Sequence, residues 1–349
     1  MIITKTPYRV SFFGGGTDYP GWFQEHGGAV LATSISHYCY IHGRVLPPFF
    51  EYKYRVVWSK IEQINKLNDI EHPVIREALK WMKFKFGMEI HHNGDLPARS
   101  GLGSSSSFSV GMLNMLHSLD SKSLTKAELA KEAIFLEQSI LNETVGIQDQ
   151  IITSHGGLNK VEILSSGEYK LKPIILSKQR ATMFEDRILL FYTGVSRFAS
   201  DIAKKQVLAI PKNKTNLHEM QKLVDIASDI LSNEGDLDDF GRLLDQTWQL
   251  KKGLESSISA NFVDDIYSKA IKAGALGGKL LGAGGGGFII FYATPDNKQS
   301  VLNALSELLI VPFKIDYTGS EVMYSQSQTY SHLSQDRSQN FLRKNLDEK

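Results

Sequence analysis

Residues 96–107 read Leu-Pro-Ala-Arg-Ser-Gly-Leu-Gly-Ser-Ser-Ser-Ser, a glycine loop that runs directly into a row of hydroxyl side chains. Apolar residues follow at the spacing of one helix face (Phe108, Met112 and Met115), so the loop is expected to open a helix. Glycine lets backbone amides converge on an anion, and the positive end of a helix dipole adds to the attraction. The stretch could therefore bind phosphate, although taken alone it is better explained as a tight turn.

Two further glycine clusters lie on either side of this loop. Residues 7–19 read Pro-Tyr-Arg-Val-Ser-Phe-Phe-Gly-Gly-Gly-Thr-Asp-Tyr, and residues 279–288 read Lys-Leu-Leu-Gly-Ala-Gly-Gly-Gly-Gly-Phe. Each cluster alone is explained by tight turns between strands. Three clusters in one chain, with hydroxyls and an Arg or Lys nearby, favour a phosphate site over three unrelated turns.

Three familiar phosphate-binding motifs do not fit the chain. The pair Gly278-Lys279 is followed by Leu280 instead of Ser or Thr, which excludes a Walker A loop. Residues 282–287 match G-x-G-x-x-G, but a helix is expected before them and a strand after them, the reverse of a dinucleotide-binding unit. The H-R-D and D-F-G triplets of protein kinases are absent.

Composition restricts the class of protein further. The chain has 349 residues, 42% of them apolar and 22% charged, which is ordinary for a globular protein of about two domains. The net charge of +1 argues against a nucleic-acid partner. Cys39 is the single cysteine, so an internal disulfide and a Cys-rich metal site are excluded, and we expect its side chain to be buried.

The order of predicted elements indicates an α+β fold, because strands and helices do not alternate regularly. Thr125 and Glu128 have the spacing of a capping box at a helix start. Strands are expected at 8–13, 30–35, 38–45, 54–58, 88–92, 158–163, 169–175, 187–192, 287–293 and 310–315. Helices are expected at 73–86, 125–137, 200–208, 217–231, 237–250, 262–273 and 298–309, in addition to the one that the serine run at 104–107 opens. The pattern changes near residue 180, which divides the chain into domains of 1–180 and 181–349. No apolar run approaches the ~20 residues of a membrane helix and no leader is visible, so a cytoplasmic protein without a membrane partner is expected.

In order and spacing, the three clusters resemble the three motifs of the GHMP small-molecule kinases. The resemblance extends from Lys5 to about Tyr292, and the middle motif is the most specific part. It implies a two-domain fold, with an N-terminal nucleotide-binding domain like ribosomal protein S5 and a ferredoxin-like C-terminal domain. Within the family, the stretches 9–18, 27–30, 146–150 and 192–197 are most similar to D-glycero-D-manno-heptose 7-phosphate kinases.

The resemblance implies an ATP site and a Mg²⁺ site. The ATP phosphates are expected on the loop of the middle motif, formed by Gly101, Leu102, Gly103, Ser104, Ser105, Ser106 and Ser107. One serine among 104–106 would contact the metal, and Ser105 is favoured. Glu137 is the expected carboxylate ligand, with Glu143 as its competitor. Oxygen ligands of this kind suit Mg²⁺, which keeps waters and takes few protein groups beside substrate phosphates.

The resemblance also assigns the catalytic pair. Asp149, in Gly146-Ile-Gln-Asp-Gln, would orient or deprotonate the attacking hydroxyl, although alone it reads as an acidic residue at a helix start. Arg9 would lie beside it and stabilise charge on the transferring phosphoryl group; the plainer alternative is a surface cation on a strand.

A sugar phosphate is the acceptor that the resemblance implies. Galactokinases carry Gly-Glu-His-Thr-Asp where residues 14–18 read Gly-Gly-Gly-Thr-Asp, so galactose is disfavoured. The expected substrate-binding residues are Asp18, Gly15, Gly16, Thr17, Gly284 and Gly285, with Arg197, Lys251 and Lys252 as anchors for the substrate phosphate. Lysines on helix faces are most often simply solvated, which is the alternative for the last two.

The function expected from the resemblance is ATP- and Mg²⁺-dependent phosphorylation of the anomeric hydroxyl of D-glycero-D-manno-heptose 7-phosphate, giving the 1,7-bisphosphate for nucleotide-heptose biosynthesis. The alternatives are another sugar-1-kinase of the fucokinase kind and a non-catalytic, ATP-binding sugar sensor. The partners are then ATP and a small sugar phosphate, and a homodimer stays open.

Overall fold

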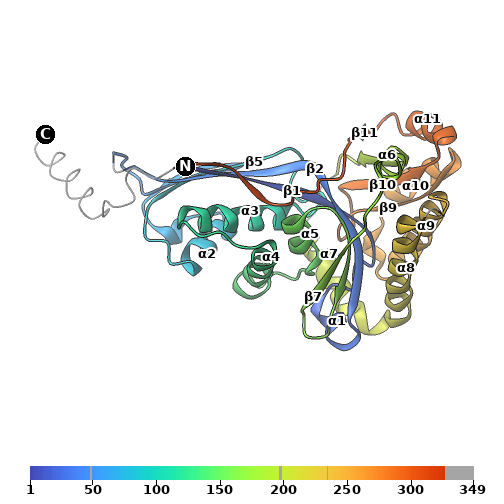
Figure 1. Cartoon of the computed structure of the whole chain (residues 1–349), viewed down its shortest axis with the longest axis horizontal. Coiled ribbons are helices and arrows are strands. Elements are labelled where there is room, and N and C mark those ends of the chain that lie inside the picture. Colours follow the sequence, from blue (N-terminus) through green and yellow to red (C-terminus); the bar gives the residue numbers. More distant parts are fainter. Residues whose placement is uncertain (48, 196–198, 234, 327–349) are drawn as a thin grey trace, which may run out of the picture.

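The structure is a computed structural model that describes residues 1–326 apart from 48, 196–198 and 234; the side chains of 199–201 and 256 are also not described. Two sheets form its frame (Figure 1). The large sheet consists of β1 (Ile2–Phe13), β2 (Gly28–Val45), β3 (Tyr54–Val57), β4 (Ile61–Ile64), β5 (Met88–Gly94), β6 (Leu158–Ile163), β7 (Tyr169–Pro173) and β12 (Glu321–Ser325). The small sheet consists of β8 (Ile188–Tyr192), β9 (Ala275–Leu280), β10 (Phe288–Ala293) and β11 (Leu309–Ile310).

The large sheet is ordered β12-β1-β2-β5-β3-β4, with β6 and β7 joined to the far part of β2. Its pairs are antiparallel except β3 with β5. The long strands β1 and β2 run the length of the sheet, and the register of this pair shifts between Ser11 and Phe13. The small sheet is antiparallel, in the order β11-β8-β10-β9.

Helices cover one face of the large sheet and gather around the small one (Figure 1). The first group is α2 (Pro73–Trp81), α3 (Ser104–Leu119), α4 (Lys126–Phe135) and α5 (Gln148–His155), with the π-helical turn η2 (Leu136–Ile140) after α4. The second is α6 (Lys178–Arg187), α7 (Ala199–Ala209), α8 (Lys214–Ser232), α9 (Asp238–Lys252), α10 (Asn261–Lys272) and α11 (Pro295–Ala304). The short elements are α1 (Pro20–His26), η1 (Leu67–Asp69), η3 (Ile210–Lys212) and η4 (Ser256–Ile258).

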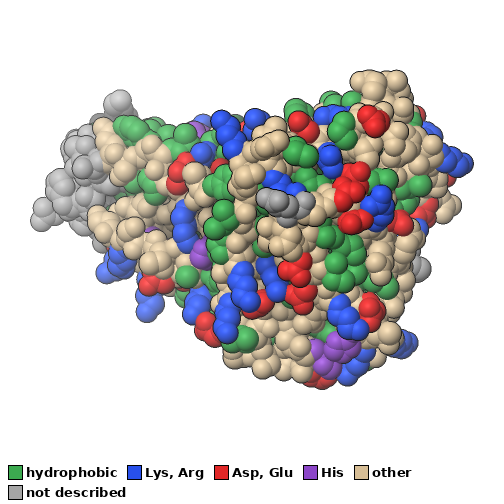
Figure 2. Space-filling view, turned by 45° about the vertical axis from the view of Figure 1, so that its right-hand side comes forward, with side chains coloured by type: hydrophobic (Ala, Val, Ile, Leu, Met, Phe, Trp, Pro, Cys, Tyr) green, Lys and Arg blue, Asp and Glu red, His purple; other side chains and the backbone are tan. Residues whose placement is uncertain are grey.

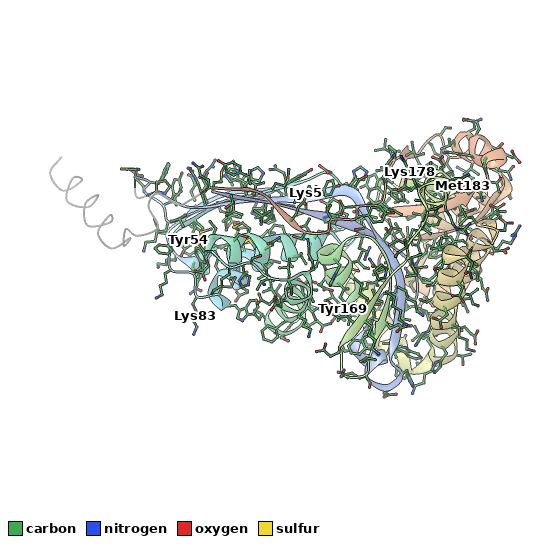
Figure 3. All side chains as sticks on the ribbon, viewed as in Figure 1. Lys5, Tyr54, Lys83, Tyr169, Lys178 and Met183 are labelled. Carbon is green, nitrogen blue, oxygen red and sulfur yellow. The ribbon has the colours of Figure 1, made fainter. Side chains whose placement is uncertain are left out.

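The main core lies between the large sheet and its helices and continues into the second half of the chain. Phe12 and Phe13 at the end of β1 are fully buried against Phe184 and Phe240, with ring centroids 5.0–5.7 Å apart in edge-to-face geometry. Figure 3 shows side chains filling the space between the sheet and α3 to α5. Because β1 ends in this shared core, residues that follow Phe13 are held at the junction of the two sheets.

Most expected elements are confirmed, and the differences have local causes. The expected strands 30–35 and 38–45 form one strand, β2. The helix expected to reach residue 86 ends at Trp81, and Lys83 has a positive φ of 52° that a helix does not continue through. The capping box of Thr125 and Glu128 is present. Cys39 is buried, and burial raises the pKa of its thiol.

Six helices and strands were not expected from the sequence: α1, β4, α5, α6, β9 and β12. The strand β9, and not the expected helix, directly precedes the third glycine cluster, because the helix α10 ends at Lys272. The region expected to be a strand at 310–315 pairs only at β11 and through an isolated bridge between Ile35 and Ile315. From there the chain returns to the large sheet, where β12 pairs with β1. The division of the chain at residue 180 stays a prediction.

The surface carries both charges. Figure 2 shows Lys and Arg side chains interspersed with Asp and Glu side chains on the face that it presents. Among the described residues, there is no helix with the length and apolar character needed to span a membrane.

Candidate active site

The glycine loop at residues 101–103 ends at the N-terminus of α3, as expected. Gly101 and Gly103 have φ values of +88° and +71°, which glycine adopts without strain. Leu102 is buried, and its carbonyl accepts a hydrogen bond from the Arg9 backbone N–H at 2.9 Å. Ser105 is exposed at the first turn of α3, whereas Ser107 turns inward and donates to the carbonyls of Pro7 and Gly103. The glycine loop at residues 101–103, the expected phosphate loop, thus offers a helix N-terminus to an anion.

Arg9 and Asp149 form a bidentate pair at this loop. The Arg9 Nε and Nη2 groups donate to the two carboxylate oxygens at 2.7 and 2.6 Å, and Nη1 donates to the Gly101 carbonyl at 2.6 Å. A Cβ on Gly103 would lie 2.9 Å from the Arg9 Cγ and 3.5 Å from an Asp149 oxygen. The structure therefore places the two expected catalytic side chains against the phosphate loop, with Asp149 in the first turn of α5.

The second and third glycine clusters pack directly on each other. A Cβ on Gly101 would lie 2.5 Å from the Leu281 carbonyl oxygen, and a Cβ on Gly282 would lie 2.5 Å from Gly101 Cα. The Phe288 N–H donates to the Ser100 carbonyl at 3.0 Å. Close backbone packing is therefore the structural reason for Gly101 and Gly282.

Glu137 lies in η2 behind the phosphate loop and is fully buried. Its Oε2 accepts from the Ser106 hydroxyl at 3.0 Å and from the Gln150 amide at 2.5 Å. Its Oε1 makes no hydrogen bond to a described residue, with Ser109 as a polar neighbour. Burial raises the pKa of the Glu137 carboxyl to about 7. The competitor Glu143 contributes its backbone N–H to the Glu137 carbonyl instead.

These groups fit a Mg²⁺ ion, because a buried carboxylate with an unused oxygen lies next to a serine hydroxyl. Ser106, and not the favoured Ser105, is in contact with Glu137. Bound there, the ion would neutralise charge on nucleotide phosphates. Among the described residues, there is no cluster of three or more His, Cys, Asp or Glu side chains that could hold a metal, so any ion depends on hydroxyl, water or phosphate oxygens as well.

Asp18 lies at the N-terminus of α5 and is 2% exposed. Its oxygens accept from the backbone N–H groups of Gly16 at 3.0 Å and Gln148 at 3.5 Å. Burial, and then the nearby charge of Asp149, raise the pKa of the Asp18 carboxyl. The expected acceptor-binding carboxylate is therefore close to the expected catalytic one.

Two buried lysines face these carboxylates from the second half of the chain. The Lys251 Nζ, at the end of α9, donates to the Gly282 carbonyl at 2.5 Å, and the Lys279 Nζ, in β9, donates to the carbonyls of Ser11 and Phe12 at 2.9 and 2.8 Å. Burial, and then the charge of Arg9, lower the pKa of Lys251 to about 8. Burial, Lys251 and Arg9 also lower the pKa of Lys279. The nearby carboxylate of Asp18 raises the pKa of both lysines, but by less than burial lowers it.

Other expected site residues are placed differently. The Thr17 hydroxyl is buried and donates to the carbonyls of Gly14 and Ala29, so it holds the glycine turn together. Lys252 pairs with Asp264 at 3.4 Å and lies over the rings of Trp248 and Tyr267. Arg197 lies outside the described residues.

Of the third cluster, Gly284 and Gly285 lie against the segment at residue 258. The Gly285 N–H donates to the Ile258 carbonyl at 3.0 Å, and a Cβ on Gly284 would lie 2.8 Å from Ile258. The Gln206 amide of α7 donates to the carbonyl of Ala283 at 2.6 Å. Neighbouring segments therefore hold this loop.

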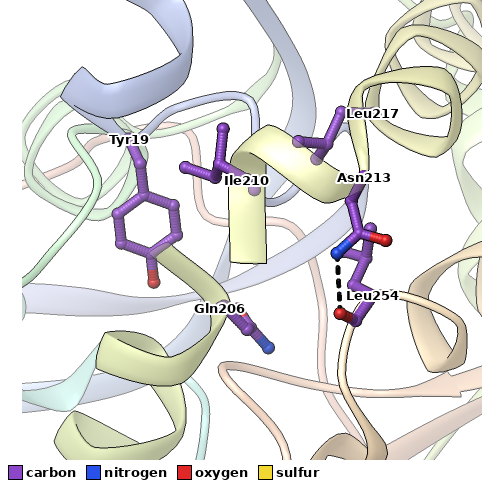
Figure 4. Close-up of a pocket in the computed structure, with 7 residues that line it drawn as sticks. Tyr19, Gln206, Ile210, Asn213, Leu217 and Leu254 are labelled. Atoms are coloured by element: carbon purple, nitrogen blue, oxygen red, sulfur yellow. Dashed lines mark hydrogen bonds between the residues drawn. The ribbon is translucent and has the colours of Figure 1, made fainter. Parts of the chain in front are cut away.

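A small cavity of about 10 Å³ lies beside the first glycine turn (Figure 4). It is lined by Gly16, Tyr19, Gln206, Ile210, Asn213, Leu217 and Leu254. The Asn213 amide is already engaged, since it donates to the Leu254 carbonyl at 2.8 Å. This volume suits about one water molecule.

The sequence did not single out three polar residues that the structure brings to the site: Ser11, Gln148 and Gln150. Ser11 lies two positions after Arg9 on β1, so both side chains are on the same face of the strand. The strand expected at 8–13 was therefore sufficient to predict that Ser11 lies beside Arg9. The other two flank Asp149 in α5, a helix that was not expected.

The glycine loop at the N-terminus of α3, the Arg9–Asp149 pair and the two-sheet fold are features expected of a small-molecule kinase. Comparison with known families agrees: the family described as "GHMP kinases N terminal domain" matches residues 72–157, and "GHMP kinases C terminal" matches residues 226–311. The chain thus carries the N- and C-terminal domains of GHMP kinases and is a sugar kinase.

Curated relatives match over most of the chain. A D-glycero-alpha-D-manno-heptose 7-phosphate kinase of Campylobacter jejuni is 28% identical over 87% of this chain and 93% of its own length. The galactokinase of Pyrococcus furiosus is 26% identical over 89% and 94%. A bifunctional fucokinase/GDP-fucose pyrophosphorylase of Arabidopsis thaliana is 25% identical over 85% of this chain, which spans 30% of that protein.

Solved structures confirm the two-domain fold. A D-glycero-D-manno-heptose 1-phosphate kinase from Bacteroides thetaiotaomicron superposes with a TM-score of 0.76 and 22% identity, over 94% of this chain and all of that one. The Lactococcus lactis galactokinase in complex with galactose gives 0.69 and 19%, over 92% and 94%. At these identities the likeness concerns the fold alone.

Proposed function

We propose that the protein transfers the γ-phosphoryl group of ATP to the anomeric hydroxyl of D-glycero-D-manno-heptose 7-phosphate. The observation that carries the proposal is the convergence of three groups: the Arg9–Asp149 pair against the phosphate loop, buried Asp18 beside it, and the buried ammonium of Lys251 near Asp18. The product would be the 1,7-bisphosphate for nucleotide-heptose synthesis, made in the cytoplasm.

Each group has a task in this proposal. The loop at Gly101–Gly103 and the N-terminus of α3 bind the ATP phosphates. Asp149 accepts the proton of the attacking hydroxyl, and Arg9 holds its carboxylate in one orientation through two parallel hydrogen bonds. Ser106 and Glu137 would hold Mg²⁺, which would neutralise charge on the nucleotide phosphates. Phosphoryl transfer depends mainly on such positioning and charge neutralisation.

Lys251 supports an acceptor that carries its own phosphate. It is 6% exposed and lies near Asp18, and its cation has no carboxylate hydrogen-bonded to it in the described part of the chain. An acceptor with about two negative charges compensates such a buried cation, whereas a neutral sugar does not. The similarity to the Campylobacter jejuni heptose 7-phosphate kinase points the same way.

A fucokinase-like activity is the second candidate, because relatives named as fucokinases match 84–85% of the chain. A non-catalytic sugar sensor is disfavoured, because a sensor has no need for the bidentate Arg9–Asp149 pair.

An ATP-consumption assay tests the proposal on heptose 7-phosphate, unphosphorylated heptose, L-fucose and galactose. We expect heptose 7-phosphate to be preferred and galactose to be nearly inert. Equal turnover of galactose and heptose 7-phosphate would contradict the substrate assignment and leave the kinase activity intact. Preference for L-fucose would favour the second candidate.

A further inference from the structure

Gly15 differs from the glycines on either side of it. Gly14 and Gly16 have φ values of +77° and +108°, and a Cβ on Gly14 would lie 1.9 Å from the Ala29 carbonyl oxygen. Gly15 has no positive φ, and the nearest atoms to its Cβ would be Ser11 Oγ at 3.7 Å and Gln148 Nε2 at 3.9 Å, ordinary contact distances. The backbone therefore requires glycine at 14 and 16 but not at 15, where its absence of a side chain keeps a space open.

Two polar side chains border this space without hydrogen-bond partners in the described part of the chain. The Ser11 hydroxyl and the Gln148 Oε1 atom are buried and unpaired, on residues that are 6% and 8% exposed. Buried polar atoms are usually paired, and leaving one unpaired costs free energy. The unpaired Ser11 hydroxyl and the Gln148 amide, whose Nε2 lies nearest to the open position and whose Oε1 is unpaired, thus border one space, which indicates that a ligand completes their hydrogen bonds.

The space lies next to the reacting groups. Ser11 is two residues beyond Arg9 on β1, so the two side chains leave the same face of the strand about 7 Å apart. Gln148 directly precedes Asp149, and its N–H donates to Asp18. A hydroxyl within one or two carbons of the phosphorylated position would reach the gap between Ser11 and Gln148.

We propose that Ser11 and Gln148 form a hydroxyl-binding subsite over Gly15, which selects acceptors with a free hydroxyl close to the one that is phosphorylated. The proposal rests on the proposed sugar kinase function. The serine hydroxyl and the amide offer both a donor and an acceptor, which matches a sugar hydroxyl and not a methylene group. A side chain at residue 15 would occupy the position of that hydroxyl.

The test compares steady-state kinetics of wild type, Ser11→Ala, Gln148→Leu and Gly15→Ala with heptose 7-phosphate at saturating ATP. Loss of one neutral hydrogen bond is expected to raise the acceptor KM about 3- to 10-fold. Gly15→Ala should raise it at least as much, and the KM for ATP should stay within twofold in all variants.

Two matched variants report on plain structural effects. Ser154→Ala removes another buried, unpaired serine hydroxyl at the opposite end of α5. Gly21→Ala adds a methyl group at a glycine without positive φ, whose Cβ would lie 3.5 Å from the nearest atom. Both should keep the acceptor KM of wild type.

Acceptor KM values within twofold of wild type for both Ser11→Ala and Gln148→Leu would overturn the subsite, as would equal increases in the KM for ATP. If wild type uses a different sugar of the panel, the heptose proposal fails, and the same variants test the subsite on that sugar. A wild-type chain that phosphorylates no sugar overturns both.

Discussion

The Arg9 guanidinium meets both carboxylate oxygens of Asp149 through parallel hydrogen bonds of 2.7 and 2.6 Å, although 140 residues separate the two in sequence. A third hydrogen bond, of 2.6 Å, ties the same guanidinium to the Gly101 carbonyl of the phosphate loop. One planar side chain therefore sets the position of the carboxylate relative to the loop. A lysine carries the same charge but lacks the planar guanidinium, whose parallel N–H groups can contact both carboxylate oxygens at once.

Asp149→Asn is expected to lower kcat by about 10²- to 10⁴-fold, because an amide cannot take up the proton of the attacking sugar hydroxyl. Binding of ATP, measured by calorimetry, should remain close to wild type. A kcat within threefold of wild type would refute the role of Asp149.

Arg9→Lys is expected to lower kcat at least about tenfold, since it keeps the charge and loses the two parallel hydrogen bonds. The matched control is Arg44→Lys, which changes an arginine paired with Glu89 on the large sheet. Equal kinetics in the two variants would show that the geometry of the Arg9–Asp149 pair is not needed for turnover.

Ser106→Ala is expected to raise the Mg²⁺ concentration for half-maximal activity at least about fivefold, because it removes the hydroxyl that donates a hydrogen bond to the Glu137 carboxylate. Ser105→Ala should leave that concentration within twofold, since Ser105 is exposed at the start of α3. Titration of activity with MgCl₂ decides between the two serines. A shift in the Ser105 variant alone would restore the assignment expected from the sequence.

Glu137→Gln should shift the same titration more than Glu143→Gln. Glu137 presents its carboxylate to Ser106 and Gln150, whereas the hydrogen bond from Glu143 to Glu137 comes from the Glu143 backbone N–H. The opposite order of the two shifts would move the metal site to Glu143.

The glycine loop before α3 and the contact between Arg9 and Asp149 were predictable from the sequence, because glycine spacing and a resemblance to known motifs act over short stretches. The contact between Ser106 and Glu137 was not, because neighbouring serines differ only in which way α3 turns them. Lys251 and Lys252 illustrate the same limit: adjacent helix residues point about 100° apart, so one is buried near Asp18 and the other pairs with Asp264.

Two of the missed elements, α5 and β12, lack a local signal in the sequence. The helix α5 has eight residues and begins with polar side chains, so apolar periodicity cannot reveal it. The strand β12 has exposed side chains on both faces and is defined by its pairing with β1, more than 300 residues away in the chain. Such pairing depends on the tertiary fold and not on local sequence.

Gly101→Ala is expected to destabilise the protein by at least about 2 kcal/mol. The residue has a φ of +88°, and an added Cβ would lie 2.5 Å from the Leu281 carbonyl oxygen, so it would push the second and third glycine clusters apart. Gly235→Ala is the control, since a Cβ there meets nothing within 4 Å. Denaturant unfolding of both variants measures the difference, and equal stabilities would show that the contact between the clusters is dispensable.

Lys251 makes the stability of the protein depend on pH in a predictable direction. Burial lowers its pKa from 10.5 to about 8, so between these values the unfolded chain binds a proton that the folded chain has released. The unfolded state then binds more protons, and the free energy of unfolding rises with pH, by roughly 1 kcal/mol between pH 8 and 9. The Lys251→Met variant should lack this increase in the free energy of unfolding when denaturant unfolding is measured at pH 8 and pH 9.

The same titration of Lys251 should affect catalysis. Between pH 8 and 9, kcat/KM of wild type for a phosphorylated acceptor should fall, because the ammonium that binds the phosphate loses its charge. The value for an unphosphorylated sugar should change less. Identical stability slopes in wild type and variant would contradict the lowered pKa, and parallel losses for both acceptors would contradict Lys251 as the phosphate anchor.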